Sequence, residues 1–76
     1  MKSVYYIENG LQIVGPNGAT GYFIVVDHIF GPGGSRTGYW INEVNRHIVR
    51  PDGADAGLWL DDEDRIFGQG HAPWMA

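Results

Sequence analysis

The motif Gly21-Tyr22-Phe23-Ile24, followed after four residues by Ile29-Phe30-Gly31-Pro32, decides how this chain folds, because the chain repeats it. Four copies are present, at about residues 4–20, 21–37, 38–56 and 57–72, and residues 73–76 resemble the start of a truncated fifth copy. Matching chemistry in four copies is typical of a repeat architecture. Each copy has two short apolar segments, equivalent to Tyr22-Phe23-Ile24 and to Ile29-Phe30. The central residue of the first segment is always aromatic, and in the four copies it is Tyr6, Phe23, Trp40 and Trp59.

Each copy is expected to form one β-hairpin. The two apolar segments of each copy are short and rich in aromatic and β-branched residues, which favours strands. Asn9-Gly10, between the two apolar segments of the first copy, predicts a type I′ turn. Pro16, Pro32 and Pro51 follow the second apolar segments of the first three copies. Each would end the strand pairing there, because proline has no N–H to donate.

We therefore predict an all-β fold of four tandem antiparallel β-hairpin repeats, each of about 17–19 residues. The hairpins would form a small barrel, a prism or a twisted meander sheet, with little or no helix. In plan the chain resembles hairpin-repeat arrays, the class that includes MORN-type repeats. This resemblance is architectural and implies no function.

Composition limits the class of protein. The chain has 76 residues, which fits a single domain over residues 1–76, and a lone core of this size is marginal. Cysteine is absent, so disulfides are excluded. The net charge of −4 argues against direct binding of nucleic acid. No apolar run approaches the roughly 20 residues of a membrane span, and no signal peptide is recognised. The compartment stays unknown, with the cytoplasm slightly favoured.

Two segments have competing interpretations. Trp40, Ile41, Val44 and Ile48 also fit helical spacing, so a helix from Trp40 to Val49 competes with the hairpin. The repeat favours strands, because the equivalent segments of the other copies are too short or too close to glycine for a helix. Trp74, in the truncated fifth copy, is expected either to pair as a ninth strand or to pair with another subunit.

Both faces of the predicted strands are apolar. Side chains alternate across a strand, so a row of tyrosine, isoleucine and leucine residues lies on one face and the central aromatic residues lie on the other. We call the second set the aromatic row. The favoured interpretation makes the aromatic row the core, with the other row half-covered. The alternatives are an interface between copies of the chain, and a stacking platform for a sugar ring, a base or a proline-rich peptide.

Charged residues follow the repeat as well. Acidic residues gather at the predicted hairpin tips and form an acidic edge of Glu8, Asp27, Glu43, Asp61, Asp62, Glu63 and Asp64. Calcium is a candidate there, but no Asp-x-Asp-x-Asp-Gly loop is present. His28 and His47 fill the repeat position that holds glutamine or arginine in the other copies, which indicates an outward polar position. We therefore predict no metal site, no cofactor and no catalytic residue.

The expected function is a non-catalytic binding or interaction module. The ligand would be a protein or a glycan, bound by the aromatic row (Tyr6, Phe23, Trp40 and Trp59) or by the acidic edge. One alternative is a self-assembling structural protein. Another is a small acidic inhibitor of a basic or nucleic-acid-binding protein. A protein partner or self-association is expected in each case, with a glycan as the other candidate partner.

Overall fold

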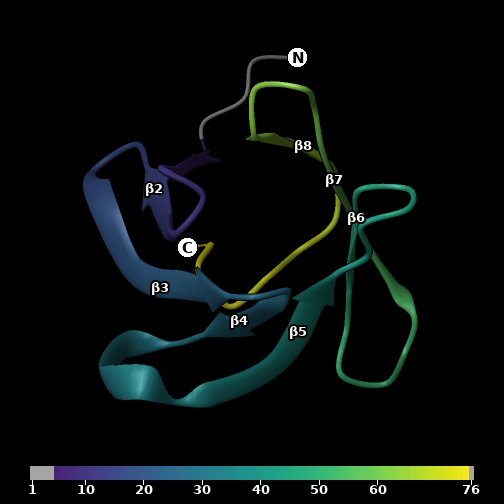
Figure 1. Ribbon diagram of the computed structural model, residues 1–76, viewed down its shortest axis with the longest axis horizontal. Coiled ribbons are helices and arrows are strands. Elements are labelled where there is room, and N and C mark those ends of the chain that lie inside the picture. Colours follow the sequence, from purple (N-terminus) through teal and green to yellow (C-terminus); the bar gives the residue numbers. More distant parts are fainter. Residues whose placement is uncertain (1–4, 76) are drawn as a thin grey trace.

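The computed structural model describes residues 5–75, which form a closed barrel of eight antiparallel strands in chain order (Figure 1). Each strand pairs with its neighbours along the chain, and β8 pairs with β1 to close the circle. This confirms the predicted all-β fold of sequential hairpins and selects the barrel among its three forms. The strands are β1 (Tyr5–Glu8), β2 (Gln12–Gly15), β3 (Gly18–Val25), β4 (His28–Phe30), β5 (Arg36–Ile41), β6 (His47–Val49), β7 (Asp55–Leu60) and β8 (Arg65–Gly68).

The four hairpins have the same register. The aromatic residue at the centre of the first strand lies opposite the residue that follows the isoleucine of the second strand. The pairs are Tyr6 with Val14, Phe23 with Phe30, Trp40 with Val49 and Trp59 with Phe67. The repeated sequence therefore corresponds to a repeated backbone arrangement.

The segment from Trp40 to Val49 is a hairpin and not a helix. Strand β5 ends at Ile41, β6 begins at His47, and Asn42 organises the loop between them. The Asn42 side-chain oxygen accepts a hydrogen bond from the Val44 N–H at 2.9 Å. The strand prediction for this segment is thus confirmed. Within residues 5–75 the helical content is one short 3₁₀ turn, η1 (Pro32–Gly34).

A β-bulge marks the entry from one copy into the next. In β5, Arg36 and Trp40 lie opposite Phe30 and His28 of β4, so the β5 side of this pairing contains two additional residues. Gly38 lies inside the bulge with a φ of 83°, a conformation that favours glycine. The glycine of the motif is explained by this bend, and the equivalent residues Gly21 and Gly57 also have positive φ.

Isoleucine and leucine side chains fill the barrel. An eight-stranded barrel has an interior just wide enough for side chains of this size. Four residues from the second strands are almost fully buried, and the first strands add a layer beside them. The first set is Ile13, Ile29, Ile48 and Ile66, and the second is Ile7, Ile24, Ile41 and Leu60.

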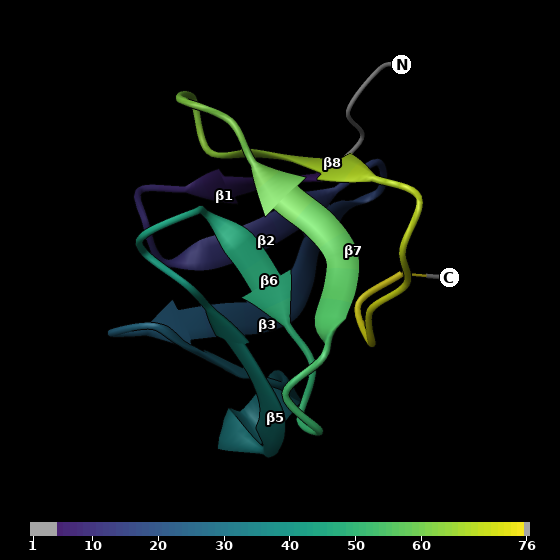
Figure 2. The same ribbon diagram turned by 90° about the vertical axis from the view of Figure 1, so that its right-hand side faces the viewer.

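The C-terminal segment closes one end of the barrel. Figure 2 shows this segment, in yellow, at the end opposite the hairpin tips. Trp74 is 6% exposed, and its ring packs edge-on against Tyr22 and Tyr39, with centroid distances of 6.0 and 6.2 Å. Residues 73 and 74 form a turn. The expectation of a ninth strand at Trp74 is therefore wrong, because its ring fills the barrel end instead of pairing with an edge.

Candidate functional site on the outer surface

The aromatic row lies on the outside of the barrel. Tyr6 and Trp59 are 41% and 43% exposed, and Phe23 and Trp40 are half-buried. The favoured interpretation of this row as the core is therefore wrong. The physical reason is alternation, because the isoleucine and leucine residues on the opposite face fill the barrel and the aromatic row on the other face is thereby directed outward.

Each ring of the aromatic row lies across from a polar side chain of the neighbouring copy. The polar residue comes from the repeat position that precedes the buried isoleucine, and this position faces outward as predicted. The pairs are Gln12 with Phe23, His28 with Trp40, His47 with Trp59 and Arg65 with Tyr6. The outer surface thus places a hydrogen-bonding group beside a large ring at all four meeting points of adjacent copies, which we call junctions.

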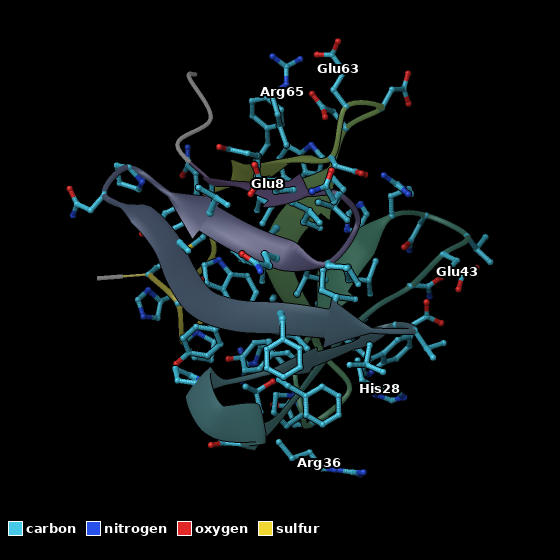
Figure 3. The ribbon with its side chains drawn as sticks, turned by 60° about the vertical axis from the view of Figure 1, so that its left-hand side comes forward. Glu8, His28, Arg36, Glu43, Glu63 and Arg65 are labelled. Atoms are coloured by element: carbon cyan, nitrogen blue, oxygen red, sulfur yellow. The ribbon has the colours of Figure 1, made fainter. Side chains whose placement is uncertain are left out.

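The β4–β5 junction contains a pocket of about 260 Å³. Its corners are His28, Phe30, Arg36 and Trp40, the two residue pairs on either side of the bulge. Gly38, inside the bulge, also lines the pocket. The hollow therefore lies at the bulge. Figure 3 shows His28 and Arg36 on the same part of the surface, with both side chains directed away from the barrel.

The β2–β3 junction has a smaller hollow of about 190 Å³. It is lined by Gln12, Gly21, Tyr22 and Phe23, and like the larger pocket it combines a polar side chain, a glycine and aromatic rings. Among residues 5–75, no charged side chain lines it. The same backbone arrangement thus gives hollows of different size and charge, depending on the side chains at the corners.

At the β6–β7 junction a hydrogen-bonded pair of side chains occupies the equivalent place. His47 Nδ1 and Asp55 Oδ2 are 2.6 Å apart, and the His47 ring leans toward Trp59 with a centroid distance of 6.0 Å. Asp55 also accepts a hydrogen bond from the Gly57 N–H. That bond, together with the one to His47, lowers the pKa of Asp55. Both polar side chains are therefore already satisfied within the protein.

Arg36 differs from the other arginines of the chain. Arg46 pairs with Asp64, Arg50 with Asp52, and Arg65 with Asp61 and Glu63, at N–O distances of 2.7 to 2.8 Å. Arg36 has no carboxylate partner among residues 5–75. The β4–β5 pocket thus contains a guanidinium group that is free to bind an anion.

The acidic edge gathers at the hairpin tips, at the open end of the barrel. A depression of about 330 Å³ lies there, with Ile7, Ile24, Ile41 and Leu60 at its base and Asp27, Glu43, Arg46 and Asp64 among its other lining residues. A hydrogen bond with Asp27, and repulsion between the two carboxylates, raises the pKa of Glu43. Asp61, Glu63 and Asp64 are held by arginines. Within the described part of the chain, no three acidic or histidine side chains converge as metal ligands would.

Two residues of the β4–β5 pocket were not identified from the sequence. The sequence pattern predicts no role for Arg36, and it predicts only a strand position for Phe30. A signal for Arg36 does exist, because it stands four residues before the aromatic centre of its copy. Ala19 and Asp55 stand at the same distance in their copies. That position varies in charge while the backbone around it repeats.

None of the helical structure in residues 5–75 is long and apolar enough to cross a membrane. The chain matches no family model, no curated protein and no solved structure.

Proposed function

We propose that the protein is a non-catalytic glycan-binding module that holds sugar rings at the junctions on its outer surface. The observation that carries this proposal is the repeated pairing of an outward aromatic ring with a polar side chain across the strand. Aromatic faces stack on the C–H faces of sugars, and amide, imidazole or guanidinium groups bind the hydroxyls. A ring with an adjacent hydrogen-bonding group is thus the basic requirement of a sugar site.

The size of the hollows favours a sugar over a folded protein. Hollows of about 190 and 260 Å³ are small, and each lies at its own junction. A stable protein interface instead requires about 800 Å² of surface on each partner, with a continuous apolar centre. Here each ring of the aromatic row lies opposite a polar side chain on one neighbouring strand and opposite an apolar side chain on the other. Small repeated sites of this kind suit the repeated units of a polysaccharide, which several junctions would bind together.

The closed barrel also weakens the self-assembly alternative. Proteins that stack through their strands need unpaired edges. Every strand of the described chain has a partner on both sides. The acidic inhibitor alternative has less support as well, because several acidic side chains at the tips are bound by arginines of the same chain.

A glycan microarray tests the proposal with the full chain as the labelled probe. The wild type should bind at least one class of glycan. The double variant Trp40→Ala, Trp59→Ala should lose about tenfold or more of that binding, the order of magnitude of stacking losses for bases on aromatic side chains. A circular dichroism spectrum should be retained, because both rings lie outside the core.

Val44→Ala is the matched control, because Val44 is an apolar residue that is 95% exposed on a hairpin tip, away from the junctions. Its binding should equal that of the wild type. Two results would overturn the proposal: the absence of binding to every glycan class, or binding that does not change when both tryptophans are removed.

A further inference from the structure

We infer that the β4–β5 pocket selects an acidic sugar, whose carboxylate binds Arg36 while its ring stacks on Trp40. This inference rests on the proposed glycan-binding function and adds the class of sugar and the residue that selects it. Uronic and sialic acids have the required chemistry, a sugar ring with a carboxylate attached.

The pocket places an aromatic ring and a guanidinium group, the two groups that such a sugar needs, at the two ends of the bulge in β5. Trp40 lies across from His28 at one end of the bulge, and Arg36 lies across from Phe30 at the other end. The pocket of about 260 Å³ lies between these two ends. A ring that stacks on Trp40 can therefore extend a substituent toward the guanidinium group, and His28 is placed beside the ring to bind a hydroxyl or the same carboxylate.

The charge distribution supports an anion at this pocket in particular. The chain as a whole carries a net charge of −4 and would repel an anion at long range. At physiological ionic strength such repulsion is screened beyond about 8 Å, so local groups decide the affinity. Three of the four arginines are paired with carboxylates, and Arg36 is not. Guanidinium binds carboxylate in a planar, two-point geometry that lysine does not reproduce.

The β6–β7 junction provides an internal comparison. Asp55 stands at the position of Arg36, and the carboxylate that it brings to the histidine belongs to the protein itself. The hydrogen-bonded contact between His47 and Asp55 thus resembles the contact that we assign to the carboxylate of an acidic sugar at His28 and Arg36. The β4–β5 pocket contains two basic side chains, His28 and Arg36, and no carboxylate of the described chain pairs with Arg36. The ligand would supply the carboxylate there.

Affinity measurements with two matched pairs of probes test the inference. Sialyllactose is compared with lactose, and trigalacturonate with maltotriose, by isothermal titration calorimetry on the full chain. The wild type should bind at least one acidic probe more tightly than its neutral counterpart. Arg36→Ala should reduce that acidic binding by about ten- to a hundredfold, the usual loss for a charged hydrogen bond. Neutral binding should change little, and Arg36→Lys should restore only part of the loss.

Arg50→Ala is the matched control, because Arg50 is an exposed arginine that pairs with Asp52 and does not line the pocket. It should leave the preference for the acidic probe intact. Equal binding of acidic and neutral probes, or a preference that survives Arg36→Ala, would overturn the inference and leave the proposed function standing. Failure of all four probes, together with a negative microarray, would overturn both.

Discussion

The β4–β5 and β6–β7 junctions share a backbone arrangement and differ in two corner residues, because Val49 and Asp55 replace Phe30 and Arg36. Both place a histidine opposite a tryptophan, and both contain a bulge with a glycine at positive φ. Arg36 leaves the first junction with an open, basic pocket, whereas Asp55 occupies the second junction and is hydrogen-bonded to His47. The comparison indicates that the repeat supplies the scaffold and that single positions outside the core determine what each junction can bind.

The largest expected effect tests whether the two junctions share one core. Ile29 and Ile48 are each 1% exposed and occupy equivalent positions in β4 and β6. Ile29→Ala and Ile48→Ala should each reduce the free energy of unfolding by about 2–5 kcal/mol, because each leaves a cavity. Urea denaturation measures both values. A large difference between them would contradict the equivalence, and Val44→Ala should change stability by less than about 0.5 kcal/mol.

A smaller effect is expected at the glycines of the two bulges. Gly38 and Gly57 have φ values of 83° and 78°. An added Cβ would lie 2.9 Å from Pro51 at the first position and 3.0 Å from Gly70 at the second. Gly38→Ala and Gly57→Ala should each cost about 1–3 kcal/mol of stability by thermal or urea denaturation.

Gly10→Ala separates the two causes of this loss, because Gly10 also has a positive φ but has nothing within 4 Å of an added Cβ. It should cost less than Gly38→Ala. Replacing Pro51 with glycine in the Gly38→Ala background should recover part of the loss if steric contact contributes. Full tolerance of alanine at Gly38 would show that the bulge does not require glycine.

The smallest expected effect is a dependence of stability on pH that is present at the β6–β7 junction and absent at the β4–β5 junction. Hydrogen bonds lower the pKa of Asp55 in the folded state below its ordinary value of 3.8. The ionised carboxylate therefore stabilises the fold above that value, and the stabilisation is lost as the pH falls through the lowered folded pKa. Asp55→Asn should thus be less stable than the wild type near neutrality, and the difference should shrink in strong acid.

Arg36→Asn is the control for this titration, because it changes the equivalent position without removing a carboxylate. Its stability relative to the wild type should not depend on acid in this way. A difference between Asp55→Asn and the wild type that stays constant from neutral to acid pH would contradict the lowered pKa of Asp55 in the folded state.

Much of the fold could be predicted from the sequence, because the repeat carries strand, turn and proline signals in every copy. The direction of the faces could not be predicted. Tyr22 and Phe23 are neighbouring aromatic residues, and alternation alone cannot tell which one faces inward. Tyr22 faces inward and packs against Trp74 at the closed end of the barrel, and that contact depends on the closure of all eight strands.

The candidate site was predicted only in part. Trp40 and His28 were identified as members of repeated positions, but their pairing across β4 and β5 depends on the bulge. The position of Arg36 beside them also depends on the bulge, because two additional residues of β5 separate the pair His28–Trp40 from the pair Phe30–Arg36. A bulge changes the register locally, and neither hydrophobic pattern nor repeat spacing reports it.

The sealing of one barrel end by Trp74 gives the protein an intrinsic optical signal. Its three indoles occupy different environments, with Trp74 buried, Trp40 half-buried and Trp59 43% exposed. Iodide quenching of fluorescence should therefore reach Trp59 first and Trp74 last. Release of the C-terminal segment would shift the emission of Trp74 to the red, and this change could be followed separately from events on the outer wall.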